Sequence, residues 1–301
     1  MSQPVAFLCL GTMGYPMAAQ LARAGHRVAV YNRTGPRADA WLAEHGAAGS
    51  GGHRVAATPA DAARGAAVVF TCAGNDDDLR EVVLSGSGAL AGMEAGALLV
   101  DHTTVSPGLA REIARAAGAK QIESLDAPVS GGQAGAEKGA LTIMVGGSQA
   151  AYDRAVPLLG CYAKRHVLMG SAGTGQLTKA VNQICIAGLV QALSEGLAFA
   201  ERAGLDTARV VEVISGGAAQ SWQMDNRAAT MLARKFDFGF AVDWMRKDLD
   251  IAITEAARIG ASLPVTELVD TFYAELQRLS RGRDDTSSLI DLLLPPVRGG
   301  R

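Results

Sequence analysis

Short apolar runs alternate with amphipathic segments up to about residue 170 of the chain. The runs have the length and residue types of buried strands and lie at Val5–Leu10, Arg27–Tyr31, Ala67–Cys72, Ala97–Asp101, Gln121–Asp126, Leu141–Gly146 and Arg165–Met169. Between them, helical spacing occurs at Met13–Ala24, Ala60–Arg64, Asp76–Leu84 and Pro107–Ala117. Strands that are apolar on both faces and joined through helices need crossover connections. We therefore expect a doubly wound α/β domain with a mostly parallel sheet.

After Gly175 the β-type runs stop and helical spacing takes over. The segment QLTKAVNQICIAGLVQALSEGLAFAERAG predicts one helix of roughly thirty residues, about 45 Å long, that ends near Gly204. Shorter helices are predicted at Thr207–Ser215, Asp225–Leu232, Trp244–Ile259, Val265–Arg278 and Ser287–Leu294. The sequence therefore predicts an α/β domain over residues 1–171 and an all-helical domain over residues 172–301. The long helix is apolar around much of its girth, so we expect it to pack against a second subunit in a homodimer or homotetramer.

Composition and charge narrow the class of partner. The 301 residues carry a formal net charge of -2, which gives no general attraction to nucleic acid or to an anionic membrane. A small-molecule partner is expected instead. The four cysteines are far apart and form no C-x-x-C pair, so we expect a reducing compartment and no metal site. The N-terminus has no basic region followed by an apolar segment, which predicts a cytoplasmic protein.

The first predicted strand runs into a glycine turn, LCLGTMGY, and then into a helical pattern. This order is the context of a dinucleotide-binding turn, in which amides at the helix start hold the pyrophosphate, and it makes the α/β domain Rossmann-type. The residues expected to contact the cofactor are Gly11, Thr12, Met13 and Gly14. Cys9 replaces the first glycine of the usual pattern, and its small side chain is expected to fit if the residue stays extended, at a modest cost in strain. The alternative is a turn that serves packing alone.

The end of the second strand indicates which dinucleotide binds. An acidic residue there would accept hydrogen bonds from the ribose of NAD, but the sequence is Asn32-Arg33-Thr34. Since a guanidinium and a hydroxyl suit a 2′-phosphate, NADP is favoured and NAD stays possible. The alternative is that Arg33 is a solvated surface residue. Strand-end positions expected near the cofactor are Cys72, Ala73 and Thr104. His102, also at a strand end, is expected to be structural.

Three later segments, DAPVSGG (126–132), GTGQLTKAVNQ (173–183) and WMRKDLDIA (244–252), accompany the glycine turn. In this order and spacing, over nearly the whole chain, they resemble the β-hydroxyacid dehydrogenase family. The resemblance implies an oxidoreductase that interconverts a short β-hydroxyacid and its semialdehyde or ketoacid. It implies that Ser130, Gly131 and Gly132 hold the substrate carboxylate. Read alone, SGG would more often be an ordinary turn.

The resemblance assigns the proton chemistry to Lys179, which matches the family's catalytic lysine. A buried lysine next to a cationic cofactor is suited to general acid–base work. Asn182 and Gln183 share its helical face and are expected to orient the lysine or the substrate oxygen. Part of the family has asparagine where Gln183 stands, while the tartronate semialdehyde reductase branch has the same Asn-Gln pair. The substrate therefore stays open between a 3-hydroxyisobutyrate-type acid, tartronate semialdehyde and succinic semialdehyde.

Two further residues follow from the resemblance or lie near the expected site. Lys247 matches a lysine that reaches the cofactor and substrate, although an isolated Lys-Asp pair is usually a solvated ion pair. Trp222 is expected either to wall the substrate pocket or to lie in the core. Imine reductases have a similar architecture but usually carry aspartate or tyrosine in place of the lysine. A catalytically silent nucleotide-binding protein is the other alternative, and it would be expected to lose Lys179.

Overall fold

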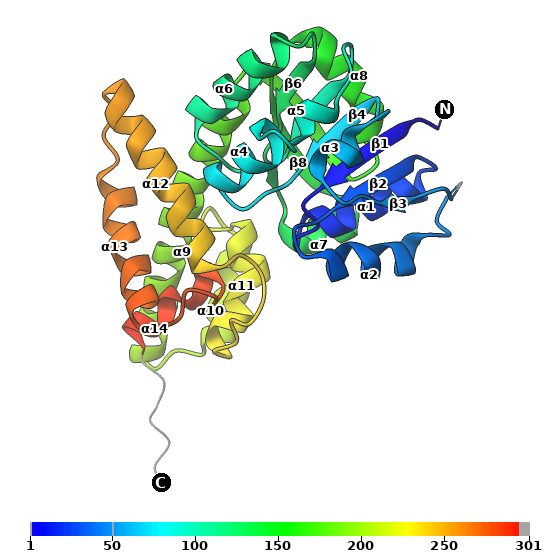
Figure 1. The fold of residues 1–301 in the computed structure, drawn as a ribbon. Coiled ribbons are helices and arrows are strands. Elements are labelled where there is room, and N and C mark those ends of the chain that lie inside the picture. The colour runs from blue at the N-terminus through cyan, green and yellow to red at the C-terminus, as the bar shows by residue number, and fades with distance from the viewer. Residues whose placement is uncertain (1, 50, 295–301) are drawn as a thin grey trace. The chain divides into compact units, whose positions relative to one another are not determined.

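The computed structural model of the chain describes residues 2–49 and 51–294 (Figure 1). Its packing divides the chain into two compact units, Met1–Lys179 and Ala180–Arg301. The predicted domain boundary between residues 171 and 172 falls just before helix α9 (Thr174–Arg202) and stays a prediction. Packing divides the chain within that helix, so its first turns, which carry Lys179, belong to the α/β unit.

The first unit is built on one sheet, in which nine strands are found within the described residues. The strands are β1 (Pro4–Leu8), β2 (Arg27–Tyr31), β3 (Arg54–Val55), β4 (Val68–Thr71), β5 (Leu98–Asp101), β6 (Glu123–Asp126), β7 (Val129–Ser130), β8 (Leu141–Gly146) and β9 (Ala163–Gly170). Their order is β3-β2-β1-β4-β5-β6-β8-β7, and β9 pairs with β8. Pairing is antiparallel only where β8 meets β6 and β7 among these strands. The mostly parallel sheet is therefore confirmed.

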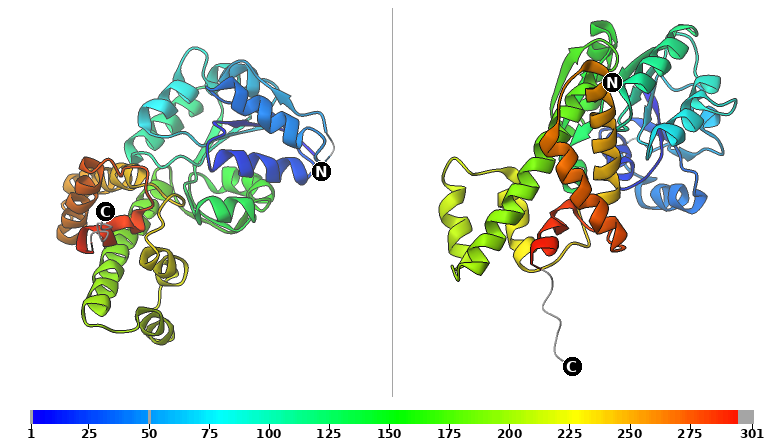
Figure 2. Two further views of the ribbon diagram at one scale, coloured as in Figure 1. Left: turned by 90° about the horizontal axis from the view of Figure 1, so that it is seen from below. Right: turned by 90° about the vertical axis from the view of Figure 1, so that its left-hand side faces the viewer.

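Helices cover both faces of this sheet (Figures 1 and 2). They are α1 (Gly14–Arg23), α2 (Gly35–His45), α3 (Pro59–Ala63), α4 (Asp76–Leu84), α5 (Ala89–Gly92), α6 (Pro107–Gly118), α7 (Gly132–Glu137) and α8 (Gln149–Leu159). Phe7 of β1 points into a core shared with α1, α2, α7 and α8, whereas its neighbour Leu8 points into a core shared with α3 to α6. Since successive side chains of a strand face opposite sides, these are the two faces of a doubly wound fold.

The second unit is helical over its described residues, as predicted. Besides most of α9, it contains α10 (Thr207–Ser215), α11 (Trp222–Leu232), α12 (Val242–Ile259), α13 (Pro264–Arg278), the 3₁₀ helix η1 (Thr286–Leu289) and α14 (Ile290–Leu293). The left-handed Gly204, with φ of 72°, follows the end of α9 as predicted.

Helix α9 is long and apolar enough to cross a membrane, but half of its most apolar stretch is buried inside the protein. Ala187 and Val190 pack with α12 and α13, and Leu193 and Leu197 pack with α11. The apolar residues of α9 are therefore accounted for in part by two hydrophobic cores, as in a core helix.

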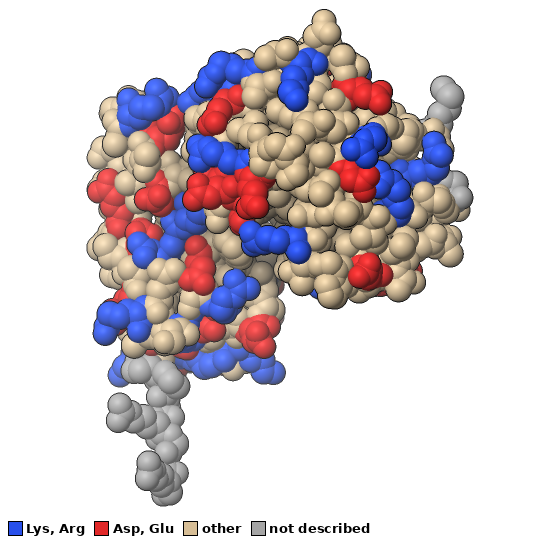
Figure 3. All heavy atoms as spheres, in the orientation of Figure 1, with Lys and Arg blue, Asp and Glu red and all other residues tan. Residues whose placement is uncertain are grey.

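Charged side chains of both signs are interspersed over each unit on the face drawn in Figure 3. This distribution agrees with the near balance of 28 basic and 30 acidic residues in the sequence. On that face, neither unit presents a broad surface of one sign.

Candidate dinucleotide and acid–base site

The glycine turn after β1 is shaped by two close approaches of backbone. A Cβ on Gly14 would overlap the carbonyl oxygen of Cys9, so only glycine fits there. Cys9 has φ of 70°, and its amide donates to the carbonyl of Tyr31 at 2.9 Å. The extended conformation that would have accommodated Cys9 is therefore not adopted, since the turn holds this residue in the left-handed region. A non-glycine residue there costs about 1–2 kcal/mol. Burial raises the pKa of its thiol to about 12, so this cysteine is not poised to react.

The turn fits the pyrophosphate of a dinucleotide. Gly11 and Thr12 are exposed, and a Cβ on Gly11 would meet nothing within 4 Å. Met13 precedes α1 without making a side-chain cap. Tyr15 donates its amide to the carbonyl of Gly11 and Pro16 has no N–H, so the amides that would face an anion are those of Thr12 to Gly14. Contact of Gly11 to Gly14 with the pyrophosphate stays a prediction.

The Asn32-Arg33-Thr34 segment lies beside this turn. Asn32 accepts from the amide of Leu10 at 2.9 Å and donates to the carbonyl of Thr34 at 3.1 Å, so its amide group braces the turn. The side chain of Arg33 is 74% exposed and pairs with Asp78 at 2.8 Å. This carboxylate raises the pKa of Arg33, which keeps a cation at the strand end.

A second arginine, missed by the sequence analysis, adjoins the turn. The Nε of Arg37 donates to the carbonyl of Leu10 at 2.9 Å, and its guanidinium lies 4.7 Å from the ring centroid of Tyr15. Arg37 stands in the first turn of α2, a helix that the sequence analysis did not predict. The feature of the sequence that could have identified Arg37 as a second cation near the turn is its position four residues after Arg33.

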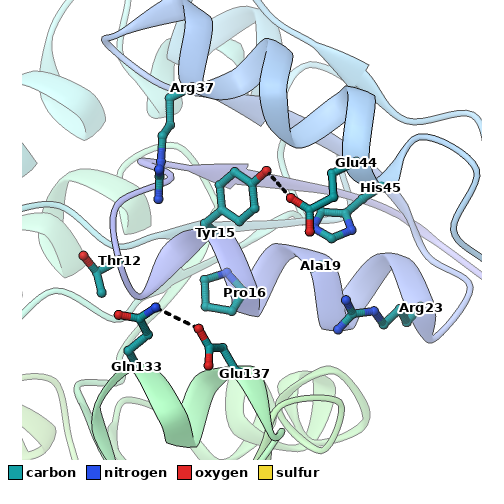
Figure 4. A pocket seen from close by; sticks show the side chains of 10 residues that line it. All are labelled: Thr12, Tyr15, Pro16, Ala19, Arg23, Arg37, Glu44, His45, Gln133 and Glu137. Carbon is teal, nitrogen blue, oxygen red and sulfur yellow. Dashed lines mark hydrogen bonds and ion pairs between the residues drawn. The ribbon is translucent and has the colours of Figure 1, made fainter. Parts of the chain in front are cut away.

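A cavity of about 370 Å³ follows α1 between α2 and α7, within the first unit (Figure 4). Thr12 and Gln133 line it, so it borders both the glycine turn and the start of α7. Its two carboxylates are engaged, Glu44 by the hydroxyl of Tyr15 and Glu137 by Gln133. Lys179 does not line this cavity, which is therefore separate from the expected proton chemistry.

The carboxyl ends of β4 and β5 are joined through buried polar groups. Asp101 accepts from the hydroxyls of Thr71 and Thr103, both at 2.6 Å. The hydroxyl of Thr103 also accepts from the amide of Ala73 at 2.9 Å, which fixes the Cys72–Ala73 turn. Burial raises the pKa of Asp101 to about 7, although the hydrogen bonds from Thr71 and Thr103 lower it. Thr104 is half-buried beside this network.

His102 is structural, as expected. Its Nδ1 lies 2.7 Å from the carbonyl of Ala127 and its Nε2 2.8 Å from the hydroxyl of Tyr162. Because a carbonyl only accepts, Nδ1 carries the proton and the tyrosine donates to Nε2. Burial lowers the pKa of His102 to about 4, so the ring stays neutral at physiological pH.

The DAPVSGG and GTGQLTK segments meet at the start of α9. Asp126, at the end of β6, accepts from the amides of Gly173 at 2.7 Å and Gln176 at 3.0 Å. The side chain of Gln176 donates to the carbonyl of Thr103 at 2.7 Å and accepts from the amide of Val105 at 3.2 Å. The sequence analysis assigned no role to Asp126 or Gln176, because these partners lie 47 to 73 residues apart.

Lys179 lies one turn further along α9 and is 7% exposed. Its Nζ donates to the carbonyl of Val129 at 3.0 Å, which places the ammonium beside the Ser130–Gly132 loop. Gly131 and Gly132 have φ of 126° and 62°, conformations that favour glycine. The loop and the lysine that the family resemblance paired are therefore neighbours.

The glycines before Lys179 allow close packing of the chain. Gly173 and Gly175 are both buried by the protein itself. A Cβ on Gly175 would lie 2.5 Å from the carbonyl oxygen of Asp126 and 2.6 Å from that of Met144. These glycines let the helix start approach β6 and β8.

In the helical unit, Gln183 donates to Asp248 at 2.7 Å and accepts from Asn182 at 2.7 Å. Lys247 pairs with the same aspartate at 3.1 Å. Three residues singled out in the sequence, Asn182, Gln183 and Lys247, therefore join one network around Asp248, which is 2% exposed. Trp222 is 53% exposed, so its alternative as a core residue is wrong.

Comparison with known proteins identifies the family. Residues 4–170 match the model described as the NAD binding domain of 6-phosphogluconate dehydrogenase, and residues 173–293 match that described as NAD-binding of NADP-dependent 3-hydroxyisobutyrate dehydrogenase. An uncharacterized oxidoreductase of Shewanella frigidimarina is 58% identical, over 95% of this chain and 96% of that protein. The 2-hydroxy-3-oxopropionate reductase of Escherichia coli is 34% identical, over 95% and 96% respectively.

Comparison with a solved structure supports the same family. The Mycobacterium tuberculosis 3-hydroxyisobutyrate dehydrogenase with L-serine superposes with a TM-score of 0.86 at 31% identity, over 97% of this chain and 99% of that one. The fold, the glycine turn and the paired lysine and SGG loop thus occur in a chain whose relatives are dehydrogenases and reductases. The chain belongs to the 3-hydroxyisobutyrate dehydrogenase family of NAD(P)-binding oxidoreductases.

Proposed function

We propose that the protein is an NADP(H)-preferring dehydrogenase that interconverts a short β-hydroxyacid and its semialdehyde or ketoacid. The main support is the 3.0 Å hydrogen bond between Lys179 and the carbonyl of Val129, which puts an ammonium next to the Ser130–Gly132 loop. A substrate whose carboxylate is held by this loop would present its hydroxyl or carbonyl oxygen near the lysine. The nicotinamide, when bound, supplies the hydride chemistry.

Each residue has a distinct role in this proposal. The Ser130 hydroxyl and the amides of Gly131 and Gly132 hold the carboxylate, since amides without a Cβ nearby suit an anion. Lys179 donates a proton to the carbonyl oxygen during reduction and takes it back during oxidation. Asn182, Gln183 and Lys247 are proposed to orient the reacting oxygen and the cofactor, on the family resemblance.

The substrate is proposed to be a three- or four-carbon acid with a hydroxyl on the β carbon. L-serine, named with the M. tuberculosis structure, has such a hydroxyl. Glycerate has one too, and 2-hydroxy-3-oxopropionate, named for the E. coli relative, is the semialdehyde of glycerate. The Asn182-Gln183 pair favours tartronate semialdehyde, as in the branch that shares it. Succinic semialdehyde is the remaining alternative.

A substrate panel tests this proposal. The purified protein is incubated with NADP⁺ or NAD⁺ and with 3-hydroxyisobutyrate, glycerate, L-serine, 3-hydroxypropionate or 4-hydroxybutyrate, and the reduced cofactor is followed by absorbance. The reverse direction uses the semialdehydes with the reduced cofactors. We expect turnover of at least one β-hydroxyacid. The absence of turnover with every acid in both directions would refute the enzyme assignment. A cyclic imine is added with the reduced cofactors, and turnover of this compound alone would favour imine reduction.

Arg33 is proposed to contact the 2′-phosphate of NADP, and Arg37 adjoins the same turn. Replacing Arg33 by Ala should weaken NADP(H) by about tenfold, or about 1.4 kcal/mol, and leave NAD(H) almost unchanged, because only NADP has the phosphate. Binding is measured by fluorescence titration of both reduced cofactors. Equal weakening of the two would exclude the phosphate contact.

The two glycines of the turn provide a matched pair of variants. At Gly11 a Cβ meets nothing within 4 Å, so Gly11→Ala should leave stability unchanged and weaken both cofactors by about tenfold, since the methyl group lies where the phosphate would approach. At Gly14 a Cβ overlaps the Cys9 carbonyl, so Gly14→Ala should lower the free energy of unfolding by about 1–3 kcal/mol. Unchanged cofactor affinity in folded Gly11→Ala would show that the turn serves packing alone.

The protein is further proposed to be a homodimer or homotetramer through α9. Apolar side chains are left uncovered along this helix, with Val181 60% and Phe199 73% exposed. A second copy of the helical unit would bury them. Analytical ultracentrifugation at micromolar concentration should give a species of at least twice the 31.0 kDa chain mass. A monomer at every concentration would refute this proposal.

A further inference from the structure

Asp126 joins the start of α9 to the loop that carries the proposed carboxylate site. Its two carboxylate oxygens accept from the amides of Gly173 and Gln176, and the amide of Gly175 also contributes. Three residues later, the carbonyl of Val129 holds the Nζ of Lys179. Residues 126–129 therefore bind α9 at two points. The carboxylate of Asp126 binds its first amides, and the carbonyl of Val129 binds its lysine.

The surroundings of Asp126 are shaped for a carboxylate of this length. A Cβ on Gly146 would lie 2.5 Å from Oδ1, and a Cβ on Gly175 would lie 2.8 Å from Oδ2. The two glycines thus allow the backbone to pack closely against the Asp126 carboxylate. Asp126 is 6% exposed. Both oxygens face amide donors, which is the arrangement that suits the ionised acid at the positive end of a helix.

Gln176 attaches the first turn of α9 to the sheet at a further place, because its side chain is hydrogen-bonded to the backbone on both sides of Thr104. Lys179 follows Gln176 by three residues, which is about 4.5 Å of helix and nearly one turn. A change in the position of the first turn is therefore passed directly to the lysine. Since burying a carboxylate costs free energy, as the raised pKa of Asp126 reflects, stability alone does not explain its choice.

We infer that Asp126 is a positioning residue, which sets the place of the Lys179 ammonium relative to the Ser130–Gly132 loop by capping α9 from strand β6. The inference rests on the proposed function, in which that lysine transfers the proton. It assigns to the first residue of the DAPVSGG segment a role in catalysis without contact to substrate. Asparagine at this position would turn an NH₂ group toward an amide donor and so remove one of the two hydrogen bonds between this side chain and the start of α9.

The test uses Asp126→Asn in the full-length protein and two readouts. The first is the rate at which acetic anhydride modifies Lys179, followed by peptide mass spectrometry with the exposed Lys138 as internal reference. The second is steady-state kinetics on the acid that the wild type oxidises. We expect acetylation of Lys179 to become at least about fivefold faster, and kcat to fall about 10–100-fold with KM and cofactor Kd within about threefold, because misplacement by about 1 Å suffices for such a loss.

Asp285→Asn is the matched control. It makes the same chemical change in an aspartate that is 1% exposed and also accepts from two backbone amides, those of Phe240 and Ser287, which lie outside α9. Its Lys179 acetylation rate and its kcat should stay within about twofold of the wild type. An equal effect of both variants would overturn the inference, since it would then reflect buried charge in general.

Gly175→Ala disturbs the same contact between Asp126 and the first turn of α9 but retains the carboxylate. It replaces Asp126→Asn in the test if that variant does not fold. Its Cβ would lie 2.5 Å from the carbonyl oxygen of Asp126, so the first turn of α9 must move away. Acetylation of Lys179 should again accelerate and kcat should fall more than KM changes. Unchanged acetylation in a folded variant overturns the inference even if no substrate is turned over, whereas a silent wild type with accelerated acetylation of the variants refutes only the proposed function.

Discussion

Replacing Lys179 by Ala should lower kcat for the β-hydroxyacid by about 10²–10⁴-fold, the usual contribution of a general acid–base group. The ammonium lies 3.0 Å from the carbonyl of Val129 and beside the Ser130–Gly132 loop, where a carboxylate-bound substrate would present its reacting oxygen. Affinity for NADP(H) should stay within about threefold, because the lysine acts on the substrate oxygen and not on the pyrophosphate. Stopped-flow single turnovers and fluorescence titration measure the two quantities.

Lys120→Ala is the control for this experiment. Lys120 also donates to a backbone carbonyl, that of Leu90 at 2.8 Å, but it follows α6 away from the three motif segments. This variant removes a lysine and a comparable hydrogen bond, so its kcat should be unchanged. If Lys179→Ala retained full turnover, another group would transfer the proton and the assignment of the lysine would be wrong.

Much of the fold was predictable because buried strands and helices repeat at different intervals. The bounds predicted for β2, β8, α4 and α10 are those observed. Helix α2 was missed because it begins with Gly35-Pro36 and buries only Ala38, Trp41 and His45, an apolar face too narrow to read. Strands β3 and β7, with two residues each, are defined by their partners and not by a pattern of their own.

The site was predictable where its residues lie close together on a helix or where the family resemblance pairs them. Spacing on a helix placed Asn182 and Gln183 on the face of Lys179, and the family resemblance placed the SGG loop near it. The engagement of Gln183 by Asp248 and the capping of α9 by Asp126 could not be read, because each joins residues at least 47 positions apart. The left-handed conformation of Cys9 depends on the Tyr31 carbonyl and on the close approach of Gly14, contacts that the order of residues in the turn does not show.

Asp101→Asn should stabilise the protein above pH 7 and have little effect near pH 4. Burial raises the pKa of Asp101 from 3.8 to about 7, so the folded protein favours the neutral acid. For an acid with a raised pKa, the favourable contribution is complete below the unfolded value and is lost as the pH rises to the folded value. The wild type should therefore lose up to about 4 kcal/mol of unfolding free energy between pH 4 and pH 7 through this group, a loss that the neutral asparagine avoids.

The difference between the two proteins isolates Asp101. His102 has the opposite dependence, because burial lowers its pKa to about 4 and its contribution is lost as the pH falls below about 6.5. Since both proteins contain His102, its effect cancels in the difference. Urea unfolding at pH 4, 5.5, 7 and 8.5 gives the free energies. The asparagine oxygen can still accept from Thr71 and Thr103, so a difference that does not change with pH would mean that Asp101 stays ionised in the folded protein throughout.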